Sequence, residues 1–317
     1  MKTAISHADV QALIHVGYPK AASSWLQKFF FTVENGYCPV LDPVTLQLSL
    51  IDASPFSYSP EHAQEWVDRR LSETPGSLDL VPSISSESLV GHAHCGGYNA
   101  RTNADRLFEL CPKGKVLIIT REQLSEIRSL YKTFITWGMP HSIERLLNPL
   151  DPGLSPQFNL DFLRYDLLVS YYQELYGKSN VLVLPYELFV LKPRIFLGKI
   201  YRFSGCSSYE KRLAKLPIRR SINRNQTMLN LIVQRWYNYF FLSGPFNYSG
   251  MFSAGEKGHD KRMRRAKRNP FPGFMDNWFE QSFTDTTQRY CAGEFVESNR
   301  RLARITGLDL AKYGYQF

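Results

Sequence analysis

The chain has 317 residues, of which 44% are hydrophobic and 14% aromatic, and it carries 38 Lys and Arg against 29 Asp and Glu. This composition excludes a largely disordered chain. The length suits one large domain or two small ones with a buried core, and we expect a single domain over residues 1–317. The net charge of +9 favours anionic partners such as nucleotides, nucleic acid, sulfated sugars or anionic lipid heads, without choosing among them.

Cysteine spacing and hydropathy narrow the class of protein further. The five cysteines include no CxxC pair, so we expect neither a disulfide scaffold nor a zinc site. No apolar stretch approaches the roughly 20 residues of a membrane helix, and Ala12–Val16 is too short for the core of a signal peptide. We therefore expect a cytoplasmic protein without stable membrane insertion.

Short apolar runs alternate with helical patterns along the chain, beginning with a strand at Ala12–Val16 and a helix at Ala22–Glu34. The other predicted strands are Leu78–Ile84, Val116–Thr120 and Val181–Leu184, and the other predicted helices are Glu61–Ser72, Leu124–Trp137, Tyr165–Leu175, Pro193–Phe203, Met228–Phe241 and Thr287–Thr306. Buried strands separated by helices predict an α/β fold, with a parallel sheet covered on both faces and a mainly helical C-terminal region. Ligands bind such sheets at the carboxyl ends of the strands.

The loop after the first strand has the composition of a phosphate-binding turn. The strand ends at Gly17, Pro19 fixes the turn, and small residues from Ala21 to Ser24 open the next helix. Small side chains let an anion approach the unpaired N–H groups of a helix start, and the Lys20 ammonium stands at the lip. An ordinary strand–turn–helix connection with an exposed lysine is the alternative interpretation of the same residues. The pattern is not GxxxxGK[ST], because the lysine precedes the small residues.

A second basic group follows the strand VLIIT. Arg121 leaves the end of this strand, and Ser129 lies two turns into the next helix. Both can converge on one phosphate at the sheet edge, the guanidinium by a bidentate fork and the serine by its hydroxyl. A solvated arginine and an ordinary helix serine are the alternative interpretation.

The two segments together resemble the PAPS-dependent sulfotransferases, which move a sulfuryl group from 3′-phosphoadenosine-5′-phosphosulfate (PAPS) to an acceptor hydroxyl. The family's phosphosulfate loop usually reads G-x-P-K-S-G-T-T-W, so Ala21-Ala22 replaces Ser-Gly here and Ser23-Ser24 replaces Thr-Thr. The family's arginine, its serine eight residues later and a tyrosine two further on match Arg121, Ser129 and Tyr131, with Gln123 where a proline is usual.

The resemblance implies a P-loop-like three-layer fold and PAPS as donor, with adenosine 3′,5′-bisphosphate (PAP) as product and no metal. By the same resemblance, Lys20 would contact the sulfuryl group and its leaving oxygen, while Arg121 and Ser129 would hold the 3′-phosphate. The implied donor-binding loop comprises Gly17, Tyr18, Pro19, Lys20, Ala21, Ala22, Ser23, Ser24 and Trp25. Trp25 matches the residue that stacks on adenine in part of the family, and a buried core tryptophan explains it equally well.

A basic segment, Lys257–Arg268, has three interpretations. It is a solvated loop, a docking patch for an anionic acceptor, or the family's basic loop that closes over the 3′ side of the nucleotide. For the last, the candidates are Arg264, Arg265, Lys267 and Arg268.

The general base is expected in the segment Ser83–Gly97, which lacks the Lys-x-x-His stretch of small-phenol sulfotransferases. Glu87 lies where carbohydrate members of the family commonly place a catalytic glutamate, and His92 and His94 are the alternatives. A carboxylate held by Lys20 or a nearby arginine is the structural alternative for Glu87.

We expect a carbohydrate, glycolipid or glycosylated metabolite as acceptor, because of Glu87 and because the aromatic segments Trp236–Phe241 and Phe246–Tyr248 could stack on sugar rings. Such helices also occur in cores, and a hydroxylated lipid, polyketide or peptide is the alternative acceptor. One rival function is a P-loop kinase, but the loop after the first strand does not have the GxxxxGK[ST] pattern, and no metal-holding aspartate directly follows Val181–Leu184. The others are a nucleotide-binding protein without catalysis and a nucleic-acid-binding protein, for which no recognisable module is present.

Overall fold

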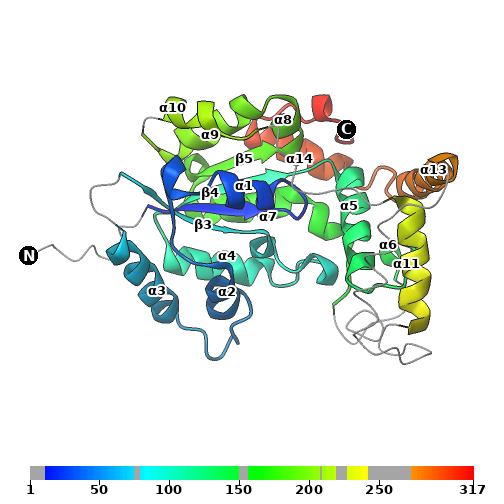
Figure 1. Cartoon of the computed structure of the whole chain (residues 1–317), viewed down its shortest axis with the longest axis horizontal. Helices are drawn as coiled ribbons and strands as arrows, with labels where there is room; N and C mark the ends of the chain where they lie inside the picture. Colours follow the sequence, from blue (N-terminus) through cyan, green and yellow to red (C-terminus); the bar gives the residue numbers. More distant parts are fainter. Residues whose placement is uncertain (1–10, 75–78, 150–155, 208, 219–226, 242–272) are drawn as a thin grey trace, which may run out of the picture. The chain divides into compact units, whose positions relative to one another are not determined.

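The structure of the protein, a computed structural model, describes residues 11–74, 79–149, 156–207, 209–218, 227–241 and 273–317. Within these residues the strands form one parallel sheet in the order β2-β3-β1-β4-β5 (Figure 1). The strands are β1 (Leu13–Gly17), β2 (Tyr37–Pro39), β3 (Val81–Ser86), β4 (Lys115–Thr120) and β5 (Val181–Pro185). Because all of them are parallel, their carboxyl ends meet at one edge of the sheet.

The chain's contacts divide it into two compact units. The first comprises residues 1–122, 160–222 and 295–317, and the second comprises residues 123–159 and 223–294. The prediction of a single domain stays a prediction. The sheet belongs to the first unit, and so do the loops that follow β1, β3 and β4.

The middle of the sheet explains why its strands form from continuous apolar runs. Every residue of β1 is buried, and Ile14 aligns with Ile84 on β3 and with Val116 on β4. A strand flanked on both sides and covered on both faces has no solvent-facing positions, so it shows no alternation of polar and apolar residues. The same register places His15 beside Ser85.

Helices cover the sheet of the first unit, with α1 in front of the strands and α7 behind them in Figure 1. The α-helices of this unit are α1 (Ser23–Phe29), α2 (Pro43–Leu46), α3 (Pro60–Glu73), α4 (Ala100–Leu110), α7 (Tyr165–Tyr176), α8 (Tyr186–Leu191), α9 (Pro193–Ser204), α10 (Tyr209–Lys215) and α14 (Val296–Thr306). This arrangement confirms the predicted α/β fold with a parallel sheet flanked by helices. None of the described helices has both the length and the apolarity to cross a bilayer.

The second unit is helical over its described residues. It contains α5 (Gln123–Thr136), α6 (Ile143–Leu147), α11 (Met228–Phe241) and α13 (Gly273–Tyr290). The buried Asn238 on α11 donates hydrogen bonds to the carbonyls of Ile135 (2.8 Å) and Met139 (3.1 Å) and so ties α11 to the end of α5. The predicted helical character of the C-terminal region is confirmed here.

Some predicted boundaries are wrong. The helix predicted over Thr287–Thr306 is two helices, α13 and α14, because the chain turns at Cys291–Phe295, where Gly293 has a left-handed φ of 77°. The helix predicted over Ala22–Glu34 ends at Phe29, and only a short 3-10 turn follows at Val33–Asn35. The sequence also did not predict β2 or α4.

Candidate active site

The loop between β1 and α1 holds two non-glycine residues in the left-handed region. Lys20 has a φ of 61° and Ala22 a φ of 69°, and no other non-glycine residue of the described ranges has a positive φ. Each such residue costs about 1–2 kcal/mol, and strain of this kind is concentrated at binding sites. Backbone in this conformation turns successive N–H groups toward one side, which forms a concave site for an anion. The loop therefore has the backbone of an anion cradle.

The polar side chains of this loop divide into exposed and buried groups. The side chains of Lys20 and Ser24 are exposed, so an ammonium and a hydroxyl stand at the mouth of the loop. Ser23 is only 2% exposed, and its Oγ has no hydrogen-bond partner in the structure. A buried hydroxyl without a partner is costly, so it points to a group that arrives from outside.

The aromatic residues of the loop are packed inward. Tyr18 lies against Phe162 and Tyr165, with ring centroids 5.2 and 4.5 Å away. Trp25 is buried and packs on Phe189 at 5.1 Å. In this structure Trp25 is a core residue, and its stacking on an adenine stays a prediction.

Arg121 lies against this loop although it is a hundred residues further along the chain. Its Nη1 donates to the carbonyl oxygen of Lys20 at 3.0 Å, and its guanidinium lies over the ring of Tyr186 at 5.1 Å. The contact follows from the sheet order, because β1 and β4 are neighbours and both end at the same edge. The Arg121 guanidinium is thus brought to the backbone of the loop that carries Lys20.

The backbone around Arg121 is fixed by residues to which sequence reasoning gave no role. The hydroxyl of Tyr165 donates to the Arg121 carbonyl at 2.6 Å, and the N–H of Glu122 donates to the Glu187 carboxylate at 2.9 Å. The Tyr315 hydroxyl lies 3.5 Å from the same carboxylate. Burial raises the pKa of Glu187 above its ordinary value. Glu187 follows the predicted strand Val181–Leu184 by three residues, and this place after a strand end is the signal that could have identified it.

Glu87 begins the segment that follows β3. It opens the 3-10 turn η4 (Glu87–Val90), which packs beside β1. Its side chain is exposed and has no hydrogen bond or ion pair within the described part of the chain. The carboxylate is therefore free to accept a proton from a bound acceptor.

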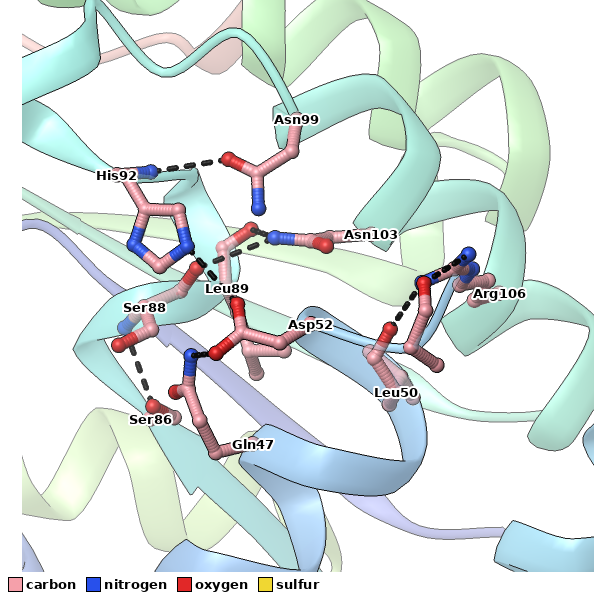
Figure 2. Close-up of polar contacts among 11 residues, drawn as sticks. Gln47, Leu50, Asp52, Ser86, Ser88, Leu89, His92, Asn99, Asn103 and Arg106 are labelled. Atoms are coloured by element: carbon pink, nitrogen blue, oxygen red, sulfur yellow. Dashed lines mark hydrogen bonds and ion pairs between the residues drawn. The ribbon is translucent and has the colours of Figure 1, made fainter. Parts of the chain in front are cut away.

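The chain after Glu87 is held from two sides (Figure 2). On one side, Asn103 of α4 donates to the carbonyl of Ser88 at 3.1 Å, and the N–H of His92 donates to Asn99 at 3.0 Å. Further along, Gly97 lies so close to the ring of Phe162 that a Cβ would be 2.6 Å from it. Because Phe162 also packs on Tyr18, this segment borders the loop after β1.

On the other side, His92 forms a pair with Asp52. The Nε2 of His92 lies 3.0 Å from Asp52 Oδ1, and Gln47 donates to Oδ2 of the same carboxylate at 2.6 Å (Figure 2). An imidazole held by a carboxylate is a common arrangement for a general base. Nothing in the sequence signals this pair, since Asp52 precedes His92 by forty residues. Burial lowers the pKa of the other candidate, His94, with His92 as a smaller cause.

Other predicted site residues belong to the second unit or lie outside the described residues. Ser129 lies on α5 in the second unit, so its pairing with Arg121 stays a prediction. The basic candidates Arg264, Arg265, Lys267 and Arg268 lie outside the described residues, as does Phe246–Tyr248. Within α11, Trp236 is 54% exposed while Asn238 is buried, so the aromatic segment presents an indole but not that amide.

A cleft of about 720 Å³ opens next to β3 in the first unit. Its floor includes Ser83 and Ser85, and its walls include Gln27, Trp66 and Arg69. The indole of Trp66 is 47% exposed, and the Arg69 guanidinium lies 5.7 Å from its ring centre. The cleft thus combines an exposed aromatic face with hydroxyl, amide and guanidinium groups.

No family model matches this chain, and no curated protein matches it in sequence. Among solved structures, the chain is similar to a sulfotransferase from Alicyclobacillus acidocaldarius, with 16% identity, a TM-score of 0.45, and coverage of 72% of this chain and 94% of that one. It is also similar to mouse sulfotransferase SULT7A1 complexed with PAP (16% identity, TM-score 0.35, 86% and 90% covered). A third similar structure is a retinol dehydratase in complex with androsterone and the inactive cofactor PAP, with 12% identity, a TM-score of 0.32, and coverage of 89% of this chain and 80% of that one. With TM-scores below 0.5, these similarities do not establish what the chain does.

Proposed function

We propose that this protein is a sulfotransferase that moves a sulfuryl group from PAPS to an acceptor hydroxyl. The observation that carries the proposal is the strained loop after β1, with Lys20 and Ala22 in the left-handed region and Arg121 hydrogen-bonded to its backbone. The donor carries phosphates on the 3′ and 5′ oxygens of one ribose, so it needs two anion sites a ribose apart. Lys20 with Ser24 offers one of them, and the Arg121 guanidinium, which lies against the same loop, offers the other.

The proposed reaction is an in-line displacement at sulfur. The acceptor oxygen forms a bond to sulfur while the bond between sulfur and the phosphate oxygen of the donor breaks, and the electron pair leaves with PAP. The Lys20 ammonium stabilises the charge on that oxygen, and Glu87 takes the proton from the acceptor hydroxyl. The resemblance to the family assigns these roles, and the exposure of both side chains at the same sheet edge supports them.

Calorimetry and turnover test the donor assignment. We expect PAP to bind, and we expect its affinity to fall sharply when the 3′-phosphate is absent. Lys20→Ala should lower turnover with labelled PAPS by roughly 10²–10³ because one preorganised charge partner is lost. Lys28→Ala, which removes an exposed lysine further along α1, is the matched control. Equal affinity for adenosine 5′-phosphosulfate would contradict the role of Arg121, and turnover that depends on ATP and magnesium would indicate a kinase.

For the acceptor we propose a carbohydrate hydroxyl, free or on a lipid or metabolite. The cleft beside β3 supports this, because the face of Trp66 can stack on a sugar ring while Arg69, Gln27 and Ser83 can bond its hydroxyls. A screen of acceptor pools with labelled PAPS, followed by glycosidase digestion, tests it. Label released by glycosidases is the expected result. Label that resists them and partitions into organic solvent would favour a lipid or polyketide acceptor and leave the donor assignment intact.

A further inference from the structure

A line of polar side chains runs beneath the anion-binding loop and is not used by the reaction described above. Gln27 on α1 and Ser85 on β3 hydrogen-bond to each other, and Ser85 hydrogen-bonds to His15 on β1. His15 is fully buried, and beyond it lies Ser23 at the start of α1. All four residues belong to the first unit.

The hydrogen bonds of this line favour one position for the ring proton of His15. The Gln27 atom that faces Ser85 is the amide nitrogen, because it also lies 3.2 Å from the Ser85 carbonyl oxygen, which can only accept. The same nitrogen therefore donates to Ser85 Oγ at 3.3 Å. Ser85 has one hydroxyl proton, and if it donates that proton to His15 Nδ1, 2.8 Å away, the Ser85 hydroxyl both accepts and donates a hydrogen bond. A neutral His15 then carries its own proton on Nε2.

The Nε2 of His15 has no hydrogen-bond partner in the structure, and neither has Ser23 Oγ. Both atoms lie beside the same face of Gly17. A Cβ on Gly17 would be 2.7 Å from His15 Nε2 and 2.5 Å from Ser23 Oγ. The glycine is thus needed here for the close approach of these two groups. A buried N–H and a buried hydroxyl are left unsatisfied side by side at the base of the loop, which is a costly arrangement unless a ligand completes it.

We propose that His15 is a positioning residue of the donor site, and that in the donor complex its Nε2–H donates to Ser23 Oγ, so that the Ser23 hydroxyl proton points to the 5′-phosphate of the donor. This inference rests on the proposed function. When the 5′-phosphate binds, Ser23 accepts from His15 and donates to a phosphate oxygen, and both unsatisfied groups gain partners. Gln27 and Ser85 act through His15 by holding the ring in the tautomer that donates from Nε2.

Calorimetry with two ligands tests this role. His15→Leu and Ser23→Ala should each weaken PAP binding by roughly 10–100-fold, the range for one hydrogen bond to a charged group. Neither should change the affinity for adenosine 3′-phosphate, which lacks the 5′-phosphate. The double variant should bind PAP no more weakly than the weaker single one, because the two residues act in series. His15→Gln should restore most of the affinity, since its amide can donate from near the position of Nε2. His62→Leu, an exposed histidine on α3, is the control.

The outcomes separate this inference from the proposed function. If the unaltered protein binds no PAP, the proposed function fails. If it binds PAP but folded His15→Leu binds PAP equally well, or loses affinity for both ligands alike, only the role of His15 is overturned. Nitrogen-15 NMR of the unaltered protein covers the case in which His15→Leu does not fold. The His15 ring should carry its proton on Nε2, and that signal should shift with PAP but not with adenosine 3′-phosphate. A proton on Nδ1 would refute the proposal.

Discussion

Ala22 is the residue at which the backbone strain of the loop between β1 and α1 can be measured most directly. Its φ of 69° is one that glycine adopts freely and alanine adopts at a cost of about 1–2 kcal/mol. Ala22→Gly removes this strain but adds backbone entropy to the unfolded chain. We therefore expect the free energy of unfolding to rise by about 0.5–1 kcal/mol in urea titrations, with PAP affinity largely kept.

Ala21 provides the control for this prediction. It is fully buried and does not have a positive φ, so Ala21→Gly should lower the free energy of unfolding. If both glycine variants are destabilised alike, the left-handed conformation of Ala22 does not limit stability. The sequence alone signals this site, because the resembled family usually has glycine at this position. It does not signal the left-handed φ of Lys20.

At the scale of elements, the segment from η4 to the start of α4 holds the candidate bases of the proposed reaction. Glu87→Gln keeps the shape of the side chain and removes its basic oxygen. We expect it to lower turnover by roughly 10²–10⁴, the usual contribution of a general base, while PAP affinity stays unchanged. Asp52→Asn should change turnover only a few-fold, because in this assignment Asp52 and His92 anchor the loop.

The opposite pattern would identify a different base. If Asp52→Asn and His92→Ala each abolish turnover while Glu87→Gln does not, the base is His92 and Asp52 orients it. His94→Ala tests the third candidate base in the same way. All four residues lie in the first unit, and thermal unfolding of each variant checks that the loss is not one of folding.

The elements also show what could be read from the sequence. The strands β1, β4 and β5 were predicted almost to the residue, because a strand buried on both faces leaves a continuous apolar run. β2 was missed because three residues that include Pro39 carry no such run. α4 was missed because Asn103 and Arg106 occupy buried positions of this helix among its apolar residues. Their side chains can be buried because they donate hydrogen bonds to backbone carbonyls. A pattern based on hydropathy cannot recognise buried polar residues.

For the whole molecule, the sheet order is the source of the candidate site. It places β1 between β3 and β4, so Lys20, Glu87 and Arg121 come from three consecutive strands at one edge. Sequence patterns identified all three, since each follows a predicted strand. They could not identify His15 or Asp52, whose roles depend on contacts with residues 70 and 40 positions away.

The burial of His15 within this sheet also predicts how the stability of the whole molecule responds to acid. Burial lowers the pKa of His15 from 6.5 to about 3. Between these two pH values the unfolded chain binds a proton at this site and the folded chain does not. Above pH 6.5 the His15 ring is neutral in both states, so its protonation does not lower the free energy of unfolding. Below that pH, the free energy of unfolding falls by about 1.4 kcal/mol per pH unit as the pH drops toward 3.

Comparison with His15→Gln isolates this contribution, because glutamine does not titrate and the other acid-sensitive groups are common to both proteins. We expect the difference in free energy of unfolding between the unaltered protein and His15→Gln, from urea titrations, to be constant above about pH 7. Below that, the unaltered protein should lose stability relative to the variant with the slope given above. A difference that stays constant down to pH 4.5 would mean that the His15 ring accepts a proton in the folded state. The assignment of His15 as a buried neutral imidazole would then be wrong.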